Sequence, residues 1–344
     1  HALAEENPQR YHGVGPLRVV SNSKRTTLSF SEAFGKTVSA LAEDNEKIVA
    51  ITAAMADGTG LSGFAKRFPN RFFDVGIAEQ HALTLAGGMA REGLRPVVAI
   101  YSTFLQRGYD QIIHDLALQN LPVVIGVDRA GVVGDDGPTH HGAFDISFLR
   151  AIPNMTILAP RTGSELTSML TWALEQSNPV AIRYPRGDAG TCYQGPAFDP
   201  RVPIPASIVK NGQDAVIFAL GPMVDIALEA ARLLEPELSC GVVNIRSIKP
   251  LDDSLRSSTY GIKKCVLTME DHVLAGGFGS SVLELLREES EVKIECIGYP
   301  DAFVPQGSIE RLHEEYGLSV QHVVRTIRKL LPGRPLKAVA REEQ

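Results

Sequence analysis

Several features that mark common protein classes are scarce in this sequence of 344 residues. Only four cysteines occur, at wide and irregular spacings: Cys192, Cys240, Cys265 and Cys296. This spacing matches neither a zinc knuckle nor a redox pair, and it indicates reduced thiols in a cytosol-like compartment. The longest apolar runs, such as LPVVIGV (121–127), have the length of a strand and are far too short to span a membrane.

Basic charge is also scarce. The net charge is −6, and no basic stripe stands out along the chain, which argues against a nucleic-acid surface. The chain begins with His1 instead of Met and shows no signal peptide. We therefore expect a processed chain or one piece of a longer protein, with neither a nucleic acid nor a membrane as partner.

The pattern that is present belongs to an α/β protein. Hydrophobic residues make up 44% and charged residues 22%, as in ordinary globular proteins of two or three domains. Residues 1–26 are polar and rich in Pro and Gly, which predicts a linker arm. Helical and strand-like segments then alternate over 27–190 and, after a linker at 191–205, again over 206–344. Continuous apolar strands between helices predict two doubly wound domains, each with a mostly parallel sheet.

Polar side chains gather at the predicted carboxyl ends of the strands, where α/β sheets bind ligands. The residues concerned are Glu79, His81, Tyr101, Phe104, Arg107, Arg129, Asp135, Asp136, His140, His141, Arg183 and Arg186. A guanidinium at such an edge suits a phosphate or a carboxylate. Together these residues predict a site for an anionic ligand with an aromatic platform.

Each of these features also has a simpler structural interpretation. Glu79 fits a first-turn acid that the helix dipole stabilises, and Phe104 fits core packing. His140 and His141 lack the spacing of a metal site. The run AGGFGSS (275–281) fits close packing of a helix on a sheet better than a phosphate site, the alternative that a helix N-terminus allows.

Four contiguous segments nevertheless resemble one family. They are DVGIAEQHALTLAGGMA (74–90), AIYSTFLQRGYDQIIHDLALQNLPV (99–123), DRAGVVGDDGPTHHGAFD (128–145) and AIRYPRG (181–187). They are similar to the 1-deoxy-D-xylulose-5-phosphate synthases, thiamine-diphosphate enzymes of the non-mevalonate isoprenoid route. The resemblance runs from about Tyr11 to Leu331.

The resemblance implies a transketolase-like fold that lacks one domain. It assigns 27–190 to the pyrimidine-binding domain and 206–344 to the transketolase C-terminal domain, the family's C-terminal two-thirds. Family members begin with a further domain that holds the diphosphate through Mg²⁺ with a GDG motif, which is missing here. We therefore expect the Mg²⁺ ligands in a separate N-terminal part, an inactive chain without that part, and a homodimer as in the family.

For the cofactor, the resemblance implies four contact residues. The family's essential glutamate falls on Glu79, whose carboxylate would hydrogen-bond a ring nitrogen of the aminopyrimidine. Phe104 would stack on the pyrimidine face, and Ile77 and Arg107 would complete the contacts.

For the substrates, the resemblance implies pyruvate as donor and glyceraldehyde 3-phosphate as acceptor. The acceptor-binding positions match Tyr101, Arg129, Asp136 and Arg186, with the two arginines as a phosphate clamp. His140 and the arm residue His12 match histidines that act on the reacting groups. His141 departs from the Gln of many family members.

Two other functions remain open at this point. The beta subunits of 2-oxoacid dehydrogenases share the fold and the glutamate, but they pass an acyl group to lipoamide and need no sugar-phosphate clamp. This half of the enzyme could also serve as a non-catalytic dimerisation fragment. We expect a bacterial cytoplasmic location, or the plastid stroma if the source is a plant or alga.

Overall fold

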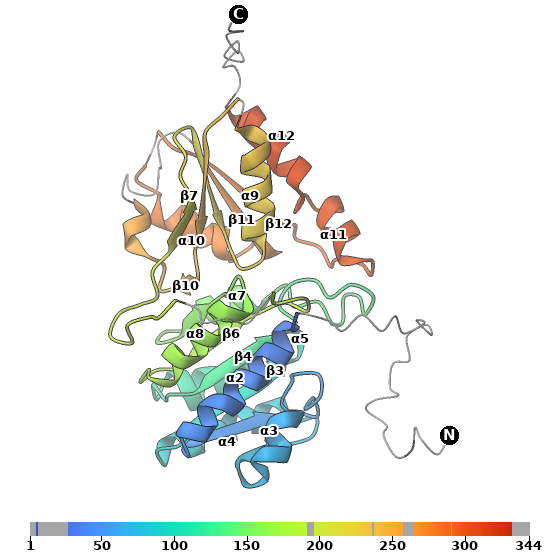
Figure 1. Cartoon of the computed structure of the whole chain (residues 1–344), viewed down its shortest axis with the longest axis vertical. Coiled ribbons are helices and arrows are strands. Elements are labelled where there is room, and N and C mark those ends of the chain that lie inside the picture. The colour runs from blue at the N-terminus through green and yellow to red at the C-terminus, as the bar shows by residue number, and fades with distance from the viewer. Residues whose placement is uncertain are drawn as a thin grey trace, which may run out of the picture.

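The computed structural model describes residue 5 and residues 27–190, 196–235, 237–256, 265–289 and 291–331. His12 and the rest of the predicted arm before Thr27 lie outside this set, apart from Glu5. Two stacked lobes are visible in Figure 1, an N-terminal lobe (27–190) and a C-terminal lobe (196–331). Within the described ranges no helix is both long and apolar enough to cross a membrane.

A seven-stranded sheet forms the centre of the N-terminal lobe. Its order is β10-β5-β6-β4-β3-β1-β2, and every pair except β10–β5 is parallel. The strands are β1 (Ile48–Thr52), β2 (Phe72–Asp74), β3 (Arg95–Tyr101), β4 (Val124–Asp128), β5 (Thr156–Leu158), β6 (Val180–Arg183) and β10 (Ser247–Lys249).

Helices cover both faces of this sheet because alternate strand residues are apolar on both sides. One face packs on α2 (Phe30–Asp44), α3 (Ser62–Arg67) and α8 (Gly163–Leu174). The other packs on α4 (Glu79–Arg91), α5 (Ser102–Leu105), a π-helical turn (Ile112–Ala117) and α7 (Asp145–Arg150). Short turns at η1 (Pro69–Arg71), η2 (Gln106–Gly108) and α6 (Tyr109–Gln111) complete the lobe.

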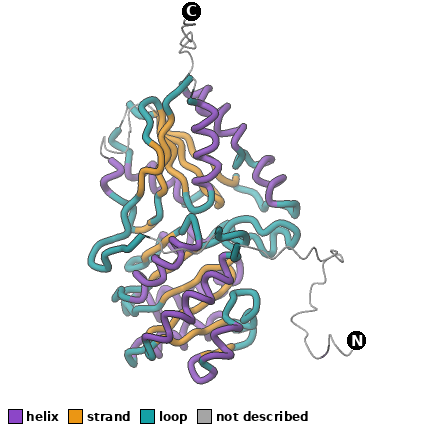
Figure 2. Tube along the Cα trace, viewed as in Figure 1, coloured by secondary structure: helices purple, strands orange, loops and turns teal. Residues whose placement is uncertain are grey.

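The C-terminal lobe has a five-stranded sheet in the order β12-β11-β8-β9-β7, parallel except for β7. Its elements are β7 (Ser207–Lys210), β8 (Ala215–Ala219), α9 (Met223–Leu234), β9 (Cys240–Asn244), η4 (Asp253–Arg256), β11 (Cys265–Val273), α10 (Phe278–Leu285), β12 (Lys293–Tyr299), α11 (Ile309–Glu315) and α12 (Val320–Leu330). Figure 2 shows helix on both sides of each sheet. The two mostly parallel, helix-covered sheets confirm the predicted fold class.

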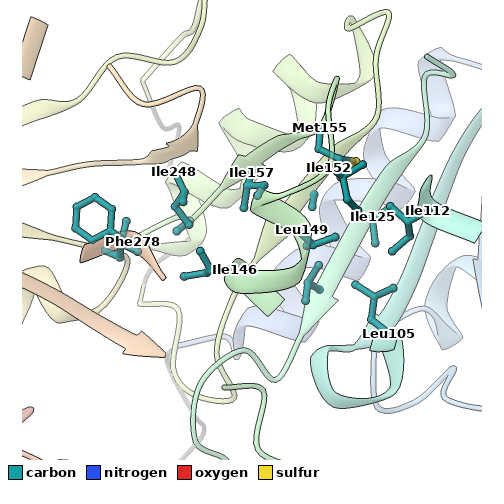
Figure 3. Close-up of a cluster of buried hydrophobic side chains, with 14 of the residues drawn as sticks. Leu105, Ile112, Ile125, Ile146, Leu149, Ile152, Met155, Ile157, Ile248 and Phe278 are labelled. Atoms are coloured by element: carbon teal, nitrogen blue, oxygen red, sulfur yellow. The ribbon is translucent and has the colours of Figure 1, made fainter. Parts of the chain in front are cut away.

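One hydrophobic cluster joins the two lobes. Figure 3 shows Ile146 and Leu149 of α7 in one cluster with Ile125 of the N-terminal sheet and with Ile248 and Phe278 from the C-terminal half. Burial of side chains of this size stabilises by roughly 1.5–3 kcal/mol each. The N-terminal sheet and α7 therefore pack against the C-terminal lobe through a shared hydrophobic core.

The segment after β9 changes direction before it forms the next strand. The chain turns at Arg246, whose φ is 61°. The following β10 then leaves its own lobe and pairs antiparallel with β5, Ser247 opposite Leu158. The turn is held by Arg246 Nε, which donates to the buried Glu165 Oε1 at 2.8 Å.

Candidate functional site

Glu79 is the first residue of α4 and lies just past the end of the edge strand β2. The preceding loop is fixed by Asp74, whose Oδ1 accepts from the amides of Ala54 and Gly76 at 2.8 and 3.0 Å. Gly76 has a φ of +69°, which favours glycine, and this turn directs the chain into the helix. The loop therefore delivers a carboxylate to the edge of the sheet.

The environment of Glu79 is that of a buried acid with an unused oxygen. Only 3% of the residue is exposed. Its Oε2 lies 3.5 Å from Arg107 Nε and has no hydrogen-bond partner within the described part of the chain. Two residues before it, Ile77 is 83% exposed. A first-turn acid stabilised only by the helix dipole needs no burial, so the structural interpretation of Glu79 leaves this oxygen unexplained.

Four predicted residues form a continuous stack next to this edge. The ring of Tyr101 stacks on Phe104 with centroids 5.6 Å apart and an interplanar angle of 11°. On one side, the Arg129 guanidinium lies 4.2 Å from the centre of the Tyr101 ring. On the other, His140 meets the edge of Phe104 at 5.5 Å. The stack joins residues from the ends of β3 and β4 and from the loop after β4.

Burial keeps the Tyr101 phenol protonated. It raises the pKa of Tyr101 to about 12, against the opposing effect of Arg129. The Tyr101 hydroxyl also lies over Gly58, where an added Cβ would come within 2.1 Å of it. The loop after β1 therefore has to pass close to the stack without a side chain at that position.

Arg129 is held in place by three contacts of one nitrogen. Its Nη1 donates to Asp128 Oδ1 at 2.7 Å, to Ser31 Oγ at 2.8 Å and to the Gly58 carbonyl at 2.5 Å. Burial alone would lower the pKa of Arg129, but Asp128 holds it above its usual value, so the guanidinium stays charged. Its Nε and Nη2 have no hydrogen bond to any residue that the structure describes, which leaves two donors for a ligand.

Arg186 and Asp136 form a more exposed pair. Arg186 Nη1 donates to Asp136 Oδ2 at 3.0 Å, and about half of each side chain is exposed. Both groups act electrostatically on Tyr101, so they lie near the stack. Asp135 is exposed on the same loop. The structure thus brings Tyr101, Asp136 and Arg186 together.

Arg183 differs from this arrangement, because the anion that it binds is a carboxylate of this chain. Its Nε donates to Asp145 Oδ2 at 2.7 Å, and its Nη2 donates to the Asp271 carbonyl at 3.2 Å. The pair is buried, with 7% of the Arg183 side chain and none of Asp145 exposed. This ion pair lies within the N-terminal lobe, and together with the Asp271 carbonyl it engages the Arg183 guanidinium, which also lines the cavity between the lobes. Arg186, three residues later, has about half of its side chain exposed and can meet a ligand.

The glycine-rich run before α10 does not offer a free phosphate site. Glu270 Oε2 and Oε1 accept from the amides of Phe278 and Gly279 at 2.6 and 2.7 Å. An added Cβ on Gly277 would lie 2.3 Å from Glu270 Oε2. The Glu270 carboxyl group already fills the helix N-terminus, and the glycines permit the close approach.

The two adjacent histidines point to different partners. His140 faces Phe104, and its Nδ1 lies 2.9 Å from Thr139 Oγ1. His141 is buried; its Nδ1 accepts from the Val133 amide and its Nε2 donates to the Pro305 carbonyl, both at 3.1 Å. His141 therefore ties the loop after β4 to the C-terminal lobe.

A cavity of about 220 Å³ lies between the lobes, lined by Arg186, Asp271 and His313 among others. Glu79, Tyr101 and Phe104 do not line it. The chain beside Glu79 reaches the surface at Ile77, which is 83% exposed. Over the residues with described positions, no group of three or more His, Cys, Asp or Glu side chains is placed to hold a metal ion.

Sequence reasoning missed Asp128 and Ser31, which hold Arg129. Asp128 is fully buried at the end of a strand of otherwise apolar residues. An acid at the end of such a strand is the signal that identifies it. Ser31, on α2 almost a hundred residues earlier, carries no such signal.

Comparisons with known proteins identify relatives over the whole described region. The family model described as "Transketolase, pyrimidine binding domain" matches residues 26–191, and "Transketolase, C-terminal domain" matches residues 205–323. The chain is 50% identical over 345 residues to 1-deoxy-D-xylulose-5-phosphate synthase 1 of Geobacter sulfurreducens, covering 98% of this chain and 54% of the relative. It is 49% identical to the synthase of Desulforudis audaxviator, covering 95% of this chain and 52% of that relative.

These matches confirm the resemblance predicted from the sequence. The chain spans about half the length of the curated relatives it matches, less than the predicted two-thirds. Among solved structures, one described as "Split gene transketolase, inactive beta4 tetramer" is 34% identical with a TM-score of 0.75, and 98% of its chain and 89% of this one are covered. Transketolase from Campylobacter jejuni shares the fold at 21% identity and a TM-score of 0.75, covering 95% of this chain and 50% of its own.

Proposed function

Because this chain belongs to the transketolase family, we propose that it is the pyrimidine-binding and C-terminal part of a thiamine-diphosphate-dependent 1-deoxy-D-xylulose-5-phosphate synthase. Residues 27–190 and 206–344 form its two domains. The assembled enzyme condenses pyruvate with glyceraldehyde 3-phosphate and releases carbon dioxide. The observation that carries the proposal is the buried Glu79 Oε2, which lacks a hydrogen-bond partner within the described ranges.

The residues around Glu79 fit an aminopyrimidine. A buried acceptor without a partner is costly, roughly 1–3 kcal/mol, unless a ligand donates to it. Glu79 would accept from a ring nitrogen of the pyrimidine, and Phe104 would offer its ring face to the heterocycle. Thiamine diphosphate, when bound, supplies a nucleophilic carbon and takes up the electrons left by decarboxylation. Ile77 and Arg107, next to Glu79, would border the same heterocycle.

The acceptor's phosphate would bind at the second cluster. Arg129 keeps two free donors within the described structure, and Arg186 is exposed, so both guanidinium groups can meet a dianion. Asp136 would then exchange part of its contact with Arg186 for the hydroxyl groups of the aldehyde. The Tyr101 hydroxyl would donate to the phosphate, because its raised pKa keeps its proton in place.

His140 is the group suited to move a proton near the reacting oxygens. It lies against Phe104, the proposed pyrimidine platform, and so borders both proposed binding clusters. Proton transfer by a positioned side chain contributes roughly 10²–10⁴-fold to rate. His12 is proposed for a similar role on the strength of the family resemblance alone, since it lies outside the described residues.

The cofactor-binding face needs a second chain or domain. Glu79 is buried, yet Ile77 beside it is 83% exposed, and the inter-lobe cavity lies elsewhere. We propose that a separate N-terminal part of the same protein holds Mg²⁺ and the diphosphate against this face, within a homodimer. The solved relative of matching extent is described as inactive, which supports the expectation that this chain alone has no turnover.

The test is reconstitution. The chain is mixed with the part that carries the diphosphate site, and carbon dioxide release and 1-deoxy-D-xylulose 5-phosphate formation are measured with and without glyceraldehyde 3-phosphate. We expect product only from the mixture and only with the aldehyde. Acyl transfer to lipoamide in place of the aldehyde would assign the chain as a 2-oxoacid dehydrogenase beta subunit. No turnover in a stable complex would make it a dimerisation fragment.

A further inference from the structure

The loop between β4 and α7 (129–144) carries three of the proposed substrate residues: Arg129, Asp136 and His140. Both ends of this loop are bound by the C-terminal lobe, at the carboxyl end of β11. We propose that Asp271 and His272 are positioning residues that hold this loop, and with it the acceptor site, in place. The link to the acceptor rests on the proposed function; the hold on the loop does not.

Asp271 binds the start of the loop. Its Oδ1 accepts from the Val132 amide at 3.2 Å and from the Tyr299 hydroxyl at 2.6 Å. Burial alone would raise the pKa of Asp271, but the nearby His313, whose Nε2 lies 3.8 Å from Oδ2, and the hydrogen bond from Tyr299 hold it below the usual value, so the carboxylate is charged. Gly131 has a φ of +84°, and an added Cβ would lie 1.8 Å from Asp271 Oδ2. The loop start is thus shaped to meet this carboxylate.

His272 binds the other end. Its Nε2 accepts from the amides of Ile146 and Ser147 at 3.1 and 3.4 Å, and its Nδ1 donates to the Val273 carbonyl at 2.7 Å. Burial lowers the pKa of His272 to about 4, so the ring is neutral and Nε2 is free to accept. Helix α7 has no side-chain cap from Phe144. The imidazole of the other lobe therefore supplies the missing cap.

A backbone contact completes the arrangement. The Val273 amide donates to the Ala143 carbonyl at 3.1 Å, so three consecutive residues of β11 bind the loop and the helix that follows it. The helix in turn carries Asp145, the partner of Arg183. A change at the carboxyl end of β11 would therefore reach the loop at both of its ends.

One contact between the lobes lies away from the loop and can therefore separate positioning of the loop from simple adhesion of the lobes. Arg161 Nη2 donates to Asp225 Oδ1 at 2.5 Å, joining the segment after β5 to α9. Its removal weakens the lobe interface and leaves Val132 and Ile146 bound. Asp225→Ala is therefore the matched control for Asp271→Ala.

The first experiment measures hydrogen exchange on the full chain and needs no activity. In Asp271→Ala, we expect exchange in peptides spanning 129–148 to rise about tenfold or more, because the Val132 amide loses its buried acceptor. Peptides from α8 stay unchanged, which reports an intact lobe. In Asp225→Ala, exchange over 129–148 stays within about twofold of wild type. No rise in Asp271→Ala, or an equal rise in both variants, overturns the inference.

If Asp271→Ala fails to fold, Tyr299→Phe tests the same contact with a smaller change. It removes one hydrogen bond to Asp271 and leaves the carboxylate in place. A smaller rise over the same peptides, with α8 unchanged, is then expected. His272→Leu tests the other end of the loop, because leucine has no acceptor for the Ile146 and Ser147 amides. Wild-type exchange over 129–148 in both Tyr299→Phe and His272→Leu would refute the inference.

The second experiment measures kinetics in the assembled enzyme. Asp271→Ala should raise KM for glyceraldehyde 3-phosphate about tenfold and leave KM for pyruvate within about twofold, while Asp225→Ala changes neither. Suppose that the wild-type enzyme makes the product, and that Asp271→Ala shows faster exchange in the loop but an unchanged KM for the aldehyde. This result overturns the positioning role and keeps the proposed function. A loosened loop in an assembly that does not use the aldehyde keeps the hold on the loop and removes the proposed function.

Discussion

Glu270 and Glu79 are buried glutamates that lie beside the starts of helices, and they differ in what binds them. Glu270, at the start of α10, receives the amides of Phe278 and Gly279 on its two oxygens. Glu79, at the start of α4, has Arg107 at 3.5 Å and an Oε2 with no hydrogen bond to the described chain. The fold binds both oxygens of the Glu270 carboxyl group, whereas one oxygen of Glu79 is left for a donor outside the described chain.

The largest expected effect is on Glu79. In the assembled enzyme, Glu79→Ala should lower turnover by about 10²–10⁴-fold or to the detection limit, because the proposed proton transfer loses its anchor. The fold should remain intact, since the removed carboxylate makes no hydrogen bond through Oε2. Initial rates and circular dichroism measure the two properties. Wild-type turnover in a folded variant would remove Glu79 from the catalytic role.

Glu270 should give the opposite result, a loss of stability. Glu270→Gln replaces an acceptor by an NH₂ group that faces one of two backbone donors, and should lower the free energy of unfolding by about 1–3 kcal/mol. Urea titration measures this change. Turnover per folded molecule is expected to stay close to wild type, and a loss of turnover without loss of stability would contradict the comparison.

The pH dependence of that stability has a defined sign. Burial raises the pKa of Glu270 to about 8, above the value of about 4.5 in the unfolded chain, so the folded state binds the extra proton between these pH values. The difference in unfolding free energy between wild type and Glu270→Gln should therefore fall as pH rises from about 5 to 8. His272, whose pKa is lowered to about 4, contributes to stability with the opposite pH dependence. Because both proteins contain His272, subtracting one unfolding free energy from the other removes much of its contribution. A flat or rising difference would argue against a protonated Glu270.

Two arginines three residues apart sharpen the same contrast. Arg186→Ala, at the exposed pair with Asp136, should raise KM for glyceraldehyde 3-phosphate about tenfold with little change for pyruvate. Arg183→Ala leaves Asp145 buried and unpaired, and should instead destabilise the chain by about 3–5 kcal/mol. Equal effects of Arg186→Ala on both substrates would show that it does not bind the phosphate.

The smallest effect is expected at His141. Its Nε2 donates to the Pro305 carbonyl, and a glutamine amide has a donor of similar reach. His141→Gln should change the unfolding free energy by less than about 1 kcal/mol and turnover by less than about twofold. A larger loss would mean that the imidazole takes part in more than the link between the lobes.

The sheets and the strand-end residues were predictable from the sequence because their signals are local. Apolar runs bounded by polar residues predict buried parallel strands, and the carboxyl ends of such strands meet at one edge. That rule brings Tyr101, Phe104 and Arg129 to one edge, whereas their stacking on one another is visible only in the structure. The π-helical turn at 112–117 and the antiparallel β7 carry no such signal in the sequence.

What could not be predicted depends on how the lobes meet. Arg183 and Arg186 are equivalent in the sequence, and only Asp145 and the Asp271 carbonyl decide which is buried. The pairing of β10 with the other lobe has the same origin.

The central claim is that the unused oxygen of Glu79 belongs to catalysis and the satisfied oxygens of Glu270 belong to the fold. The most direct test compares Glu79→Gln and Glu270→Gln in the assembled enzyme, with the rate of 1-deoxy-D-xylulose 5-phosphate formation and the urea midpoint measured on each. We predict that Glu79→Gln loses the rate and keeps the midpoint, and that Glu270→Gln keeps the rate of the folded fraction and lowers the midpoint. The same outcome for both variants, or the reverse, would contradict the account.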